Sequence, residues 1–473
     1  MDKYKKLASN TIIFAIGSFG AKIINFLLTR LYTSYMDSDM FGVKELIEIT
    51  ANFIIPIVTF SIAEAIIRYG LKNEYDKKEI FSTAVFTVLG GLGILALLTP
   101  LFNFIPYLDG YGFLLYLYVF CSCFRSICSN FVRARGMVKL FSLDGILATL
   151  SLLIFNLIFI AALGMGVKGF LISVILSDFC SGMFLTVVAK LHKFLSLKSC
   201  NKKTFVMMLK FSLPLVPAAL LWIVTGFSDR LLIRYMDGPE GLVGGSANGI
   251  YTGASKIPNL IAMISTIFYQ AWNMSSIMES SSEDLPKFYT KIYAAYESIL
   301  CIAASFLIAL VIPLSKILLN IKKFPEYSTS FRYTPVLVMA VLFMCLSQFL
   351  SSVYNTRKKT KNSFVTSLIA AVVNIGLNLI LIPKFGIQGA GVATLASYFA
   401  CYVARIIDAR RYIPFKVDLL KTAMNTLVLL GMCGVIVFMP NGWIDYLIAG
   451  VCFITIANFG AVIRTVKRVL KKR

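Results

Sequence analysis

The sequence has few of the residues that soluble enzymes use for catalysis. Charged residues make up 15% of its 473 residues, against roughly 25% in soluble globular domains. His192 is the single histidine, which argues against histidine catalysis and histidine metal sites. The ten cysteines contain no Cys-x-x-Cys pair, and all except Cys200 lie in or beside apolar runs. We therefore expect small buried residues at these positions, with no disulfides and no metal.

Long polar connections are also missing. The longest expected connections cover about residues 190–204 and 274–287, which excludes an exposed catalytic domain. The formal net charge is +23, a value that would suggest a nucleic-acid partner in a soluble protein. In this chain the cytoplasmic excess of Lys and Arg that orients membrane proteins explains the charge better, and no nucleic-acid partner is expected.

Apolar runs of about 20 residues recur along the whole chain, and each is long enough to cross a bilayer as a helix. The fold class is therefore an all-α polytopic membrane protein with about 14 transmembrane helices. The expected spans are 8–36, 42–68, 80–102, 111–132, 142–163, 167–189, 205–236, 247–274, 288–312, 332–354, 363–383, 387–409, 417–439 and 443–464.

Basic residues concentrate in alternate connections between these spans. This pattern predicts that both termini lie in the cytoplasm. It places Arg405 in a cytoplasmic connection and Lys44 in an outer one. The expected location is the cytoplasmic membrane of a bacterium, with the chain crossing it many times.

The chain contains a diverged internal repeat. Arg30-Leu31 aligns with Arg230-Leu231, and three further matches follow in the same order. Six spans form each copy, so the copies should be two six-helix lobes in parallel orientation, related by a pseudo-two-fold axis along the membrane normal. The predicted domains are an N-lobe at 1–200, a C-lobe at 201–412, and two extra helices with a basic tail at 413–473.

Six cations fall well inside the expected spans. A charge at the bilayer centre costs at least about 2.5–3.5 kcal/mol, so such residues face protein or a hydrated cavity. Five of them occupy spans 1, 7 and 8, which suggests a cationic cleft between the lobes. The six are Lys22, Arg30, Arg125, Arg230, Arg234 and Lys256.

Polar side chains share helix faces with these cations. Asn25 lies on the face of Lys22, and Asn259 and Gln270 lie on the face of Lys256. These nine residues are the candidate binding site for an anionic substrate. Two alternatives to a binding role stay open. Arg30, Arg230 and Arg234 lie near the outer ends of their spans and could reach lipid headgroups. Arg125 could instead form an interhelical ion pair with Glu297 or Asp178.

Acidic residues inside the spans are fewer than the cations. Asp178 and Glu297 are candidates for binding a coupling Na⁺ or H⁺, and Asp229 can pair locally with neighbouring cations. Span 7 also contains Pro214 and Pro217. Proline removes a helical hydrogen bond, so we expect a kink there that is either static or a hinge.

One stretch of the sequence resembles a known family. "FSLPLVPAALLWIVTGFSDRLLIRYM" (211–236) is followed by "ANGIYTGASKIPNLIAMISTIFYQAW" (247–272), and "AEAIIRYG" occurs at 63–70. These motifs are similar to those of polysaccharide biosynthesis (Wzx-type) oligosaccharide flippases of the multidrug/oligosaccharidyl-lipid/polysaccharide exporter superfamily. The resemblance implies two lobes, alternating access, and a substrate sugar carried on undecaprenyl pyrophosphate.

The resemblance also implies a transporter without catalytic residues or a cofactor. Membrane lipids and the lipid-linked oligosaccharide are the expected partners of a monomer, with a polysaccharide polymerase and chain-length machinery as further candidates. Three other functions remain: a drug/cation antiporter of the same superfamily, a lipid II-type flippase, and a membrane polymerase or ligase. The antiporter would use buried carboxylates to bind Na⁺ or H⁺ and a cationic drug, and the excess of cations inside the spans argues against it. The enzyme would need a large outer loop, which the expected spans do not leave.

Overall fold

The computed structural model describes residues 24, 27–71, 74–278, 283–357 and 359–471. Throughout these residues the regular structure is helical, with no strand. The chain divides into two compact units, Met1–Phe227 and Ser228–Arg473. The all-α polytopic fold is confirmed, while the domain limits near residues 200 and 412 stay a prediction.

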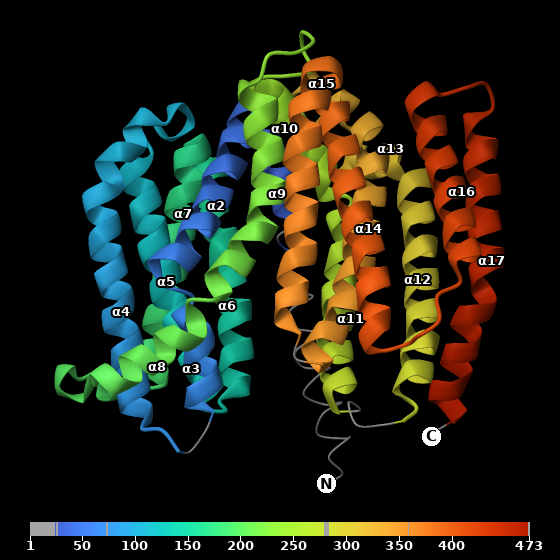
Figure 1. The fold of residues 1–473 in the computed structure, drawn as a ribbon. Helices are drawn as coiled ribbons and strands as arrows, with labels where there is room; N and C mark the ends of the chain where they lie inside the picture. Colours follow the sequence, from blue (N-terminus) through green and yellow to red (C-terminus); the bar gives the residue numbers. More distant parts are fainter. Residues whose placement is uncertain (1–23, 25–26, 72–73, 279–282, 358, 472–473) are drawn as a thin grey trace. The chain divides into compact units, whose positions relative to one another are not determined.

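The first unit is built from near-parallel long helices, with α8 running across their lower ends (Figure 1). A helix at residues 27–35 precedes the labelled elements. These are α2 (Ser38–Val58), α3 (Ile62–Gly70), α4 (Lys77–Leu98), η1 (Thr99–Phe104), η2 (Pro106–Leu108), α5 (Gly112–Ala134), α6 (Val138–Asn156), η3 (Leu157–Ala162), α7 (Gly166–Val188), η4 (Leu191–Phe194), η5 (Leu197–Ser199) and α8 (Lys202–Ser212).

Helix α9 (Leu215–Tyr235) begins in the first unit and ends in the second. The second unit packs α12, α14, α16 and α17 as long neighbouring helices (Figure 1). Its elements are α10 (Gly245–Lys256), α11 (Asn259–Met278), α12 (Leu285–Ala309), α13 (Val311–Leu318), η6 (Pro325–Thr329), α14 (Ser330–Thr356), α15 (Thr360–Tyr412), α16 (Leu419–Phe438) and α17 (Trp443–Lys471).

Ten helices in the described residues are long and apolar enough to cross a membrane, or eleven if the bent pair α2 and α3 forms one span. This number is compatible with the predicted 14 without confirming it. Part of the first predicted span lies outside the described residues. Two predicted spans, 363–383 and 387–409, fall within the single element α15, and span 247–274 is divided between α10 and α11.

Helix α15 is a hairpin of two helical arms. Its backbone leaves helical geometry at Gly386, where φ is 53° and ψ is −130°. A Cβ at this residue would lie 2.4 Å from the Cβ atom of Leu242, so only glycine fits the turn. The arms then run antiparallel, because Asn362 in the first arm donates a 2.8 Å hydrogen bond to Asp408 in the second. The two predicted spans are therefore present as the two arms.

Two other breaks interrupt the helices of the first unit. Helices α2 and α3 meet at an angle of 56°, with Phe60 and Ser61 at positive φ between them. Helix α8 ends at Ser212 and α9 begins at Leu215, so the interruption falls at Pro214. Pro217 lies in the first turn of α9, where a missing N–H group costs no helical hydrogen bond. A hinge role for either proline stays a prediction.

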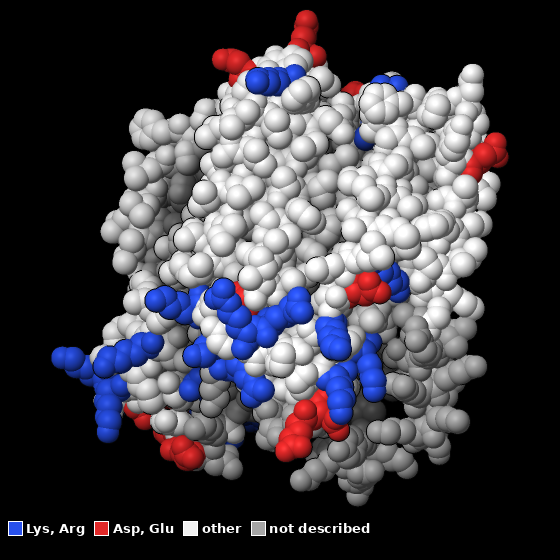
Figure 2. Space-filling view, turned by 45° about the vertical axis from the view of Figure 1, so that its right-hand side comes forward, with Lys and Arg blue, Asp and Glu red and all other residues white. Residues whose placement is uncertain are grey.

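Charge and apolar surface separate along the helices. On the face shown in Figure 2, most Lys and Arg side chains gather towards one end, and an almost uncharged surface lies above them. Exposed leucines such as Leu97, with 82% of its surface accessible, cover the membrane-spanning helices. An apolar exposed face is what a lipid environment requires. The chain is therefore a multi-pass membrane protein.

Two basic residues lie inside the fold and not in connections, contrary to the sequence-based placement. Lys44 is in α2 and 3% exposed, and Arg405 is in α15 and fully buried. Arg405 donates hydrogen bonds of 2.8–3.0 Å to Ser347, Thr366 and Ser367, and so ties α14 to both arms of α15. The charge-alternation rule assigned both residues wrongly because it does not recognise cations whose partners are buried.

Candidate functional site

The second unit contains a buried carboxylate surrounded by neutral hydrogen-bond donors. Asp229 in α9 is 1% exposed. Four side chains from α10 and α15 donate to it at 2.6–3.0 Å: Tyr251, Asn374, Asn378 and Thr394. The local ion pair expected for Asp229 is absent from the described residues, because these four neutral groups take its place. We call these five residues the Asp229 cluster.

Oxygen atoms dominate the Asp229 cluster. The side-chain Oδ1 of Asn378 is buried and has no hydrogen-bond partner, while its Nδ2 donates to Asp229. Asn374 Oδ1 accepts from Ser228 at 2.8 Å. Carboxylate, amide and hydroxyl oxygens are the ligands that hard cations prefer. These oxygens could hold a monovalent cation. Within the described residues, no group of three or more His, Cys, Asp and Glu side chains is placed to hold a metal ion.

Two predicted site cations lie close to this cluster. The Arg230 side chain reaches Ser255 in α10 at 3.4 Å, and its guanidinium carbon is 5.7 Å from the centre of the Tyr251 ring. Lys256 follows Ser255 at the end of α10 and is partly exposed. Arg230 in α9 therefore contacts the last turn of α10, the helix that ends at Lys256. We call this pair the candidate cationic part of the second unit.

The remaining predicted residues of this unit are more dispersed. Arg234 is partly exposed, with its guanidinium 5.8 Å from the Tyr235 ring. Asn259 is exposed and begins α11 after a break at Ile257 and Pro258. This break interrupts the straight polar stripe expected on span 8. The sequence already contains the signal for it, since proline cannot continue the helical hydrogen bonds. Gln270 lies in α11, and its side chain is outside the described atoms.

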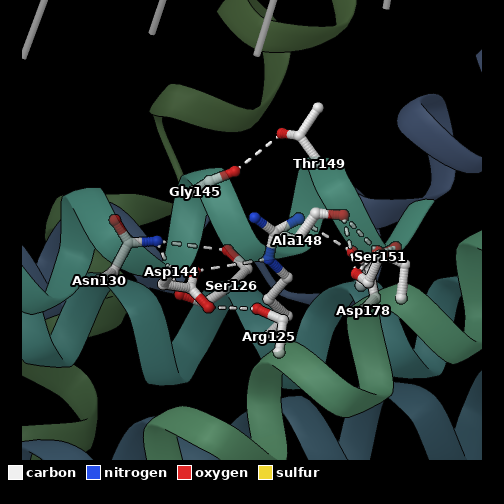
Figure 3. Close-up of polar contacts among 12 residues, drawn as sticks. Arg125, Ser126, Asn130, Asp144, Gly145, Ala148, Thr149, Ser151 and Asp178 are labelled. Atoms are coloured by element: carbon white, nitrogen blue, oxygen red, sulfur yellow. Dashed lines mark hydrogen bonds and ion pairs between the residues drawn. The ribbon is translucent and has the colours of Figure 1, made fainter. Parts of the chain in front are cut away.

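The first unit holds a different arrangement, shown in Figure 3. Arg125 in α5 pairs with Asp178 in α7 at 2.9 Å and lies 3.7 Å from Asp144 in α6. Ser122 also donates to Asp178, and Ser181 donates to Asp144. The interhelical ion pair with Asp178, one of the two alternatives for Arg125, is therefore present. We call Arg125, Asp144 and Asp178 the Arg125 triad, which joins three helices.

Glu297 is the other predicted coupling residue. It lies in α12, is 3% exposed, and accepts a 2.6 Å hydrogen bond from Thr422 in α16. A cavity of about 210 Å³ reaches it, lined also by Lys416, Asp418 and Lys421. Arg125 and Glu297 belong to different units, and no ion pair between them occurs in the described residues.

The other predicted binding residues belong to the first unit. Lys22 and Asn25 lie outside the described residues, and Arg30 is partly exposed on the helix at 27–35. The prediction did not include Lys44 as a buried cation. Its Nζ pairs with Glu45 at 2.9 Å and with Glu48, and lies 4.3 Å from the Phe170 ring centre.

Sequence reasoning also missed the three partners of Asp229 in α15. Asn374 and Asn378 are four residues apart in an apolar run, so they share one helix face. That spacing was the available signal. Thr394 carries no such signal, because the turn at Gly386 brings it opposite the asparagines.

Comparisons with known proteins agree with this architecture. A family model described as polysaccharide biosynthesis protein matches residues 7–272. A second model, described as lipid II flippase MurJ, matches residues 278–457. The first description names polysaccharide synthesis, and the second names a lipid flippase.

Three curated relatives match parts of the chain. The uncharacterized membrane protein MJ1375 of Methanocaldococcus jannaschii is 27% identical over 270 residues, which is 54% of this chain and 61% of that protein. MJ1068 of the same organism is 23% identical over 39% of this chain and 37% of its own length. A probable lipid II flippase MurJ of Thermotoga maritima is 32% identical over 20% of each. The matched segments cover less than two thirds of each relative.

Solved structures share the fold over most of the chain. The inward-facing conformation of a multidrug resistance MATE family transporter of the MOP superfamily has a TM-score of 0.64 at 16% identity, covering 85% of this chain and 94% of that one. A MATE in the straight conformation has a TM-score of 0.59 at 16% identity, covering 88% and 97%. At this identity the likeness establishes the fold.

Proposed function

Because the chain belongs to the polysaccharide biosynthesis protein family, we propose that it moves an undecaprenyl-pyrophosphate-linked oligosaccharide from the inner to the outer leaflet. The observation that carries this proposal is the family match over residues 7–272. The fold of MATE transporters supports an alternating-access mechanism, in which two bundles open to one side and then to the other.

The chemistry of the second unit suits such a substrate. A pyrophosphate-linked glycolipid has an anionic head and an apolar tail, so its head needs cationic donors in a hydrated space. Arg230 and Lys256 lie on adjoining helices and supply charge-assisted hydrogen bonds to phosphate oxygens. Lys22, Asn25, Arg30, Arg234, Asn259 and Gln270 remain proposed members of this site, and Arg125 is a weaker candidate because it pairs with Asp178.

The driving force has two candidate sources. When the inside of the membrane is negative, moving a doubly negative head outward is downhill by about 2.3 kcal/mol per charge for every 100 mV. A coupling Na⁺ or H⁺ is the second source. Among the buried carboxylates, Asp229 suits Na⁺ best, because neutral groups surround it and Asn378 Oδ1 is unpartnered. Asp178 already pairs with Arg125, and Glu297 remains the alternative for H⁺.

Reconstitution tests the proposal directly. Purified protein is inserted into liposomes that carry a fluorescent undecaprenyl-pyrophosphate oligosaccharide, and a membrane-impermeant quencher reports the fraction exposed outside. We expect the exposed fraction to exceed that of protein-free liposomes and to rise further when an imposed potential drives anions outward. A protein that leaves this fraction unchanged, with and without Na⁺, is not a flippase for this lipid.

A lipid II-type substrate is the second candidate function. The match of residues 278–457 to the lipid II flippase model favours it. Lipid II presents the same pyrophosphate and tail with a different saccharide, so the cationic site would serve either. Parallel liposomes with fluorescent lipid II separate the two, because the natural substrate should flip faster than the other lipid. The cationic-drug antiporter is disfavoured by the cations at Arg230 and Lys256.

A further inference from the structure

Helix α8 is fixed against the ends of α3 and α4 in the first unit. Thr204 in α8 donates a 2.5 Å hydrogen bond to Glu79 in α4. The Arg68 guanidinium carbon lies 4.3 Å from the Phe211 ring centre. The Tyr69 ring centre lies 6.0 Å from the same Phe211 ring centre. These contacts hold α8 across the lower ends of the spanning helices (Figure 1). Such an orientation places an amphipathic helix at the membrane surface.

The side of α8 towards α3 borders a shallow basic cavity that is broadly open to its surroundings. Lys202, Lys203 and Lys210 line it together with Tyr69 and Asn201. No carboxylate in the described part of the chain lies within 4.0 Å of any of these three lysine ammonium groups. The cavity therefore presents three cationic donors to a ligand.

A second, mostly apolar cavity adjoins the first. It measures about 510 Å³ and runs along α4, lined by Phe86, Gly90 and Ile94, with Phe60 and Phe205 on its sides. Asn201 and Lys202 line both cavities, so the two cavities lie next to each other at the start of α8.

Two adjacent glycines of α4 shape the apolar cavity. A Cβ atom at Gly91 would lie 2.0 Å from the carbonyl oxygen of Val58, so α2 and α4 touch there. A Cβ atom at Gly90 would meet nothing within 4 Å, so Gly90 leaves open space. The close contact supports the cavity wall, while the missing side chain at Gly90 provides its width.

We propose that these adjoining cavities bind one anionic phospholipid of the membrane. Its phosphate lies among Lys202, Lys203 and Lys210, and one acyl chain lies along α4 over Gly90. The argument is charge complementarity: three cations line one cavity, and the cavity beside it is mostly apolar and runs along α4. The site belongs to the first unit alone and does not depend on the proposed transport function.

Lipid binding to the purified full-length protein tests the proposal. Thermal unfolding in detergent is measured while phosphatidylglycerol, phosphatidylcholine with the same chains, or inorganic phosphate is titrated. Phosphatidylglycerol should raise the unfolding temperature saturably. It should do so at a concentration at least tenfold lower than phosphatidylcholine requires. An equal response to both lipids overturns the proposal, and so does a full response to inorganic phosphate alone.

Charge variants test the headgroup end. The triple variant K202Q/K203Q/K210Q should bind phosphatidylglycerol at least tenfold more weakly, as measured by native mass spectrometry. The matched control K139Q/K193Q/K198Q removes three exposed lysines that line neither cavity, and should bind like the parent. Similar loss in both triple variants would show a general charge effect and contradict the site.

Glycine variants test the chain end. Gly90→Leu should fill the groove and weaken phosphatidylglycerol binding at least tenfold, since the open space accepts the side chain without a clash. Gly93→Leu is the matched control, because a Cβ atom there also meets nothing within 4 Å and the residue lies outside both cavities. Unchanged binding in Gly90→Leu, with both variants folded in the absence of lipid, would overturn the proposal.

Discussion

The two units bury carboxylates in opposite ways. In the first unit, Arg125 pairs with Asp178 and approaches Asp144, so a cation accompanies two buried acids. In the second unit, Asp229 accepts four hydrogen bonds from neutral side chains. A buried charge needs a partner or strong hydrogen bonds. The first arrangement provides its own cation, while in the described residues the second surrounds its carboxylate with neutral donors alone.

From this difference we propose a structural role for the first arrangement and a functional role for the second. The Arg125 triad links α5, α6 and α7, and it already contains its counter-charge. The Asp229 cluster links α9, α10 and α15, and it keeps an unpartnered amide oxygen at Asn378. We therefore expect the triad to govern stability and the cluster to govern cation dependence.

The largest expected effect is on the stability of the Arg125 triad. Arg125→Gln removes the cation and leaves Asp144 and Asp178 facing each other. Breaking a buried pair costs about 3–5 kcal/mol, and we expect about 3 kcal/mol because the arginine side chain is 30% exposed. Chemical denaturation with a fluorescence readout measures the change. A loss below 1 kcal/mol would show that the triad does not hold the helices together.

The next effect concerns the Asp229 cluster. Asp229→Asn keeps the shape but removes the charge that a Na⁺ would need. At a Na⁺ concentration 100 times its dissociation constant, the parent should gain about 2.7 kcal/mol of stability. The variant should gain no stability from Na⁺. The measurement compares the free energy of unfolding of each protein in NaCl with that in choline chloride. Asp178→Asn is the control and should keep the full gain; an equal loss in both variants would contradict the comparison.

Helix positions could be predicted from the sequence because apolar length decides them. The spans near 80–102, 111–132 and 167–189 correspond to α4, α5 and α7. The break between α2 and α3 was missed, since Phe60 and Ser61 lie within an apolar run and a single serine there does not mark a turn. Such a break depends on tertiary packing, which a hydropathy pattern does not contain.

Buried charges were harder to predict than helices. The count of basic residues assigned Lys44 and Arg405 to connections, although the predicted spans 42–68 and 387–409 include them. The structure places both within helices beside polar partners. Asp229 was expected to pair with cations, yet residues of α15, more than 140 positions away, satisfy it. Contacts of such large sequence separation arise from the fold and not from local spacing.

A smaller effect is expected at the cationic part of the second unit. Arg230→Gln should slow flipping about tenfold, because one charge-assisted hydrogen bond to phosphate is worth roughly 1.5 kcal/mol. Lys384→Gln, an exposed residue on the same unit, is the control and should keep the parental rate. The rates come from the quenching assay at equal protein density. Equal rates for Arg230→Gln and the control would remove Arg230 from the substrate site.

The smallest effect is expected for Glu297. Glu297→Gln keeps an oxygen acceptor for Thr422, so stability should change by no more than about 1 kcal/mol. Flipping should retain its Na⁺ dependence, as measured by repeating the assay in choline. A variant that loses Na⁺ dependence would transfer the coupling role from Asp229 to Glu297.

One measurement tests the central claim most directly. Liposomes carry the same fluorescent oligosaccharide on undecaprenyl pyrophosphate or on an uncharged polyprenyl glycoside, and leaflet exposure is followed for both. The account predicts protein-dependent flipping of the pyrophosphate lipid and little flipping of the uncharged one, because the cations at Arg230 and Lys256 recognise the head. Equal rates for the two lipids, or no flipping of either, would contradict it.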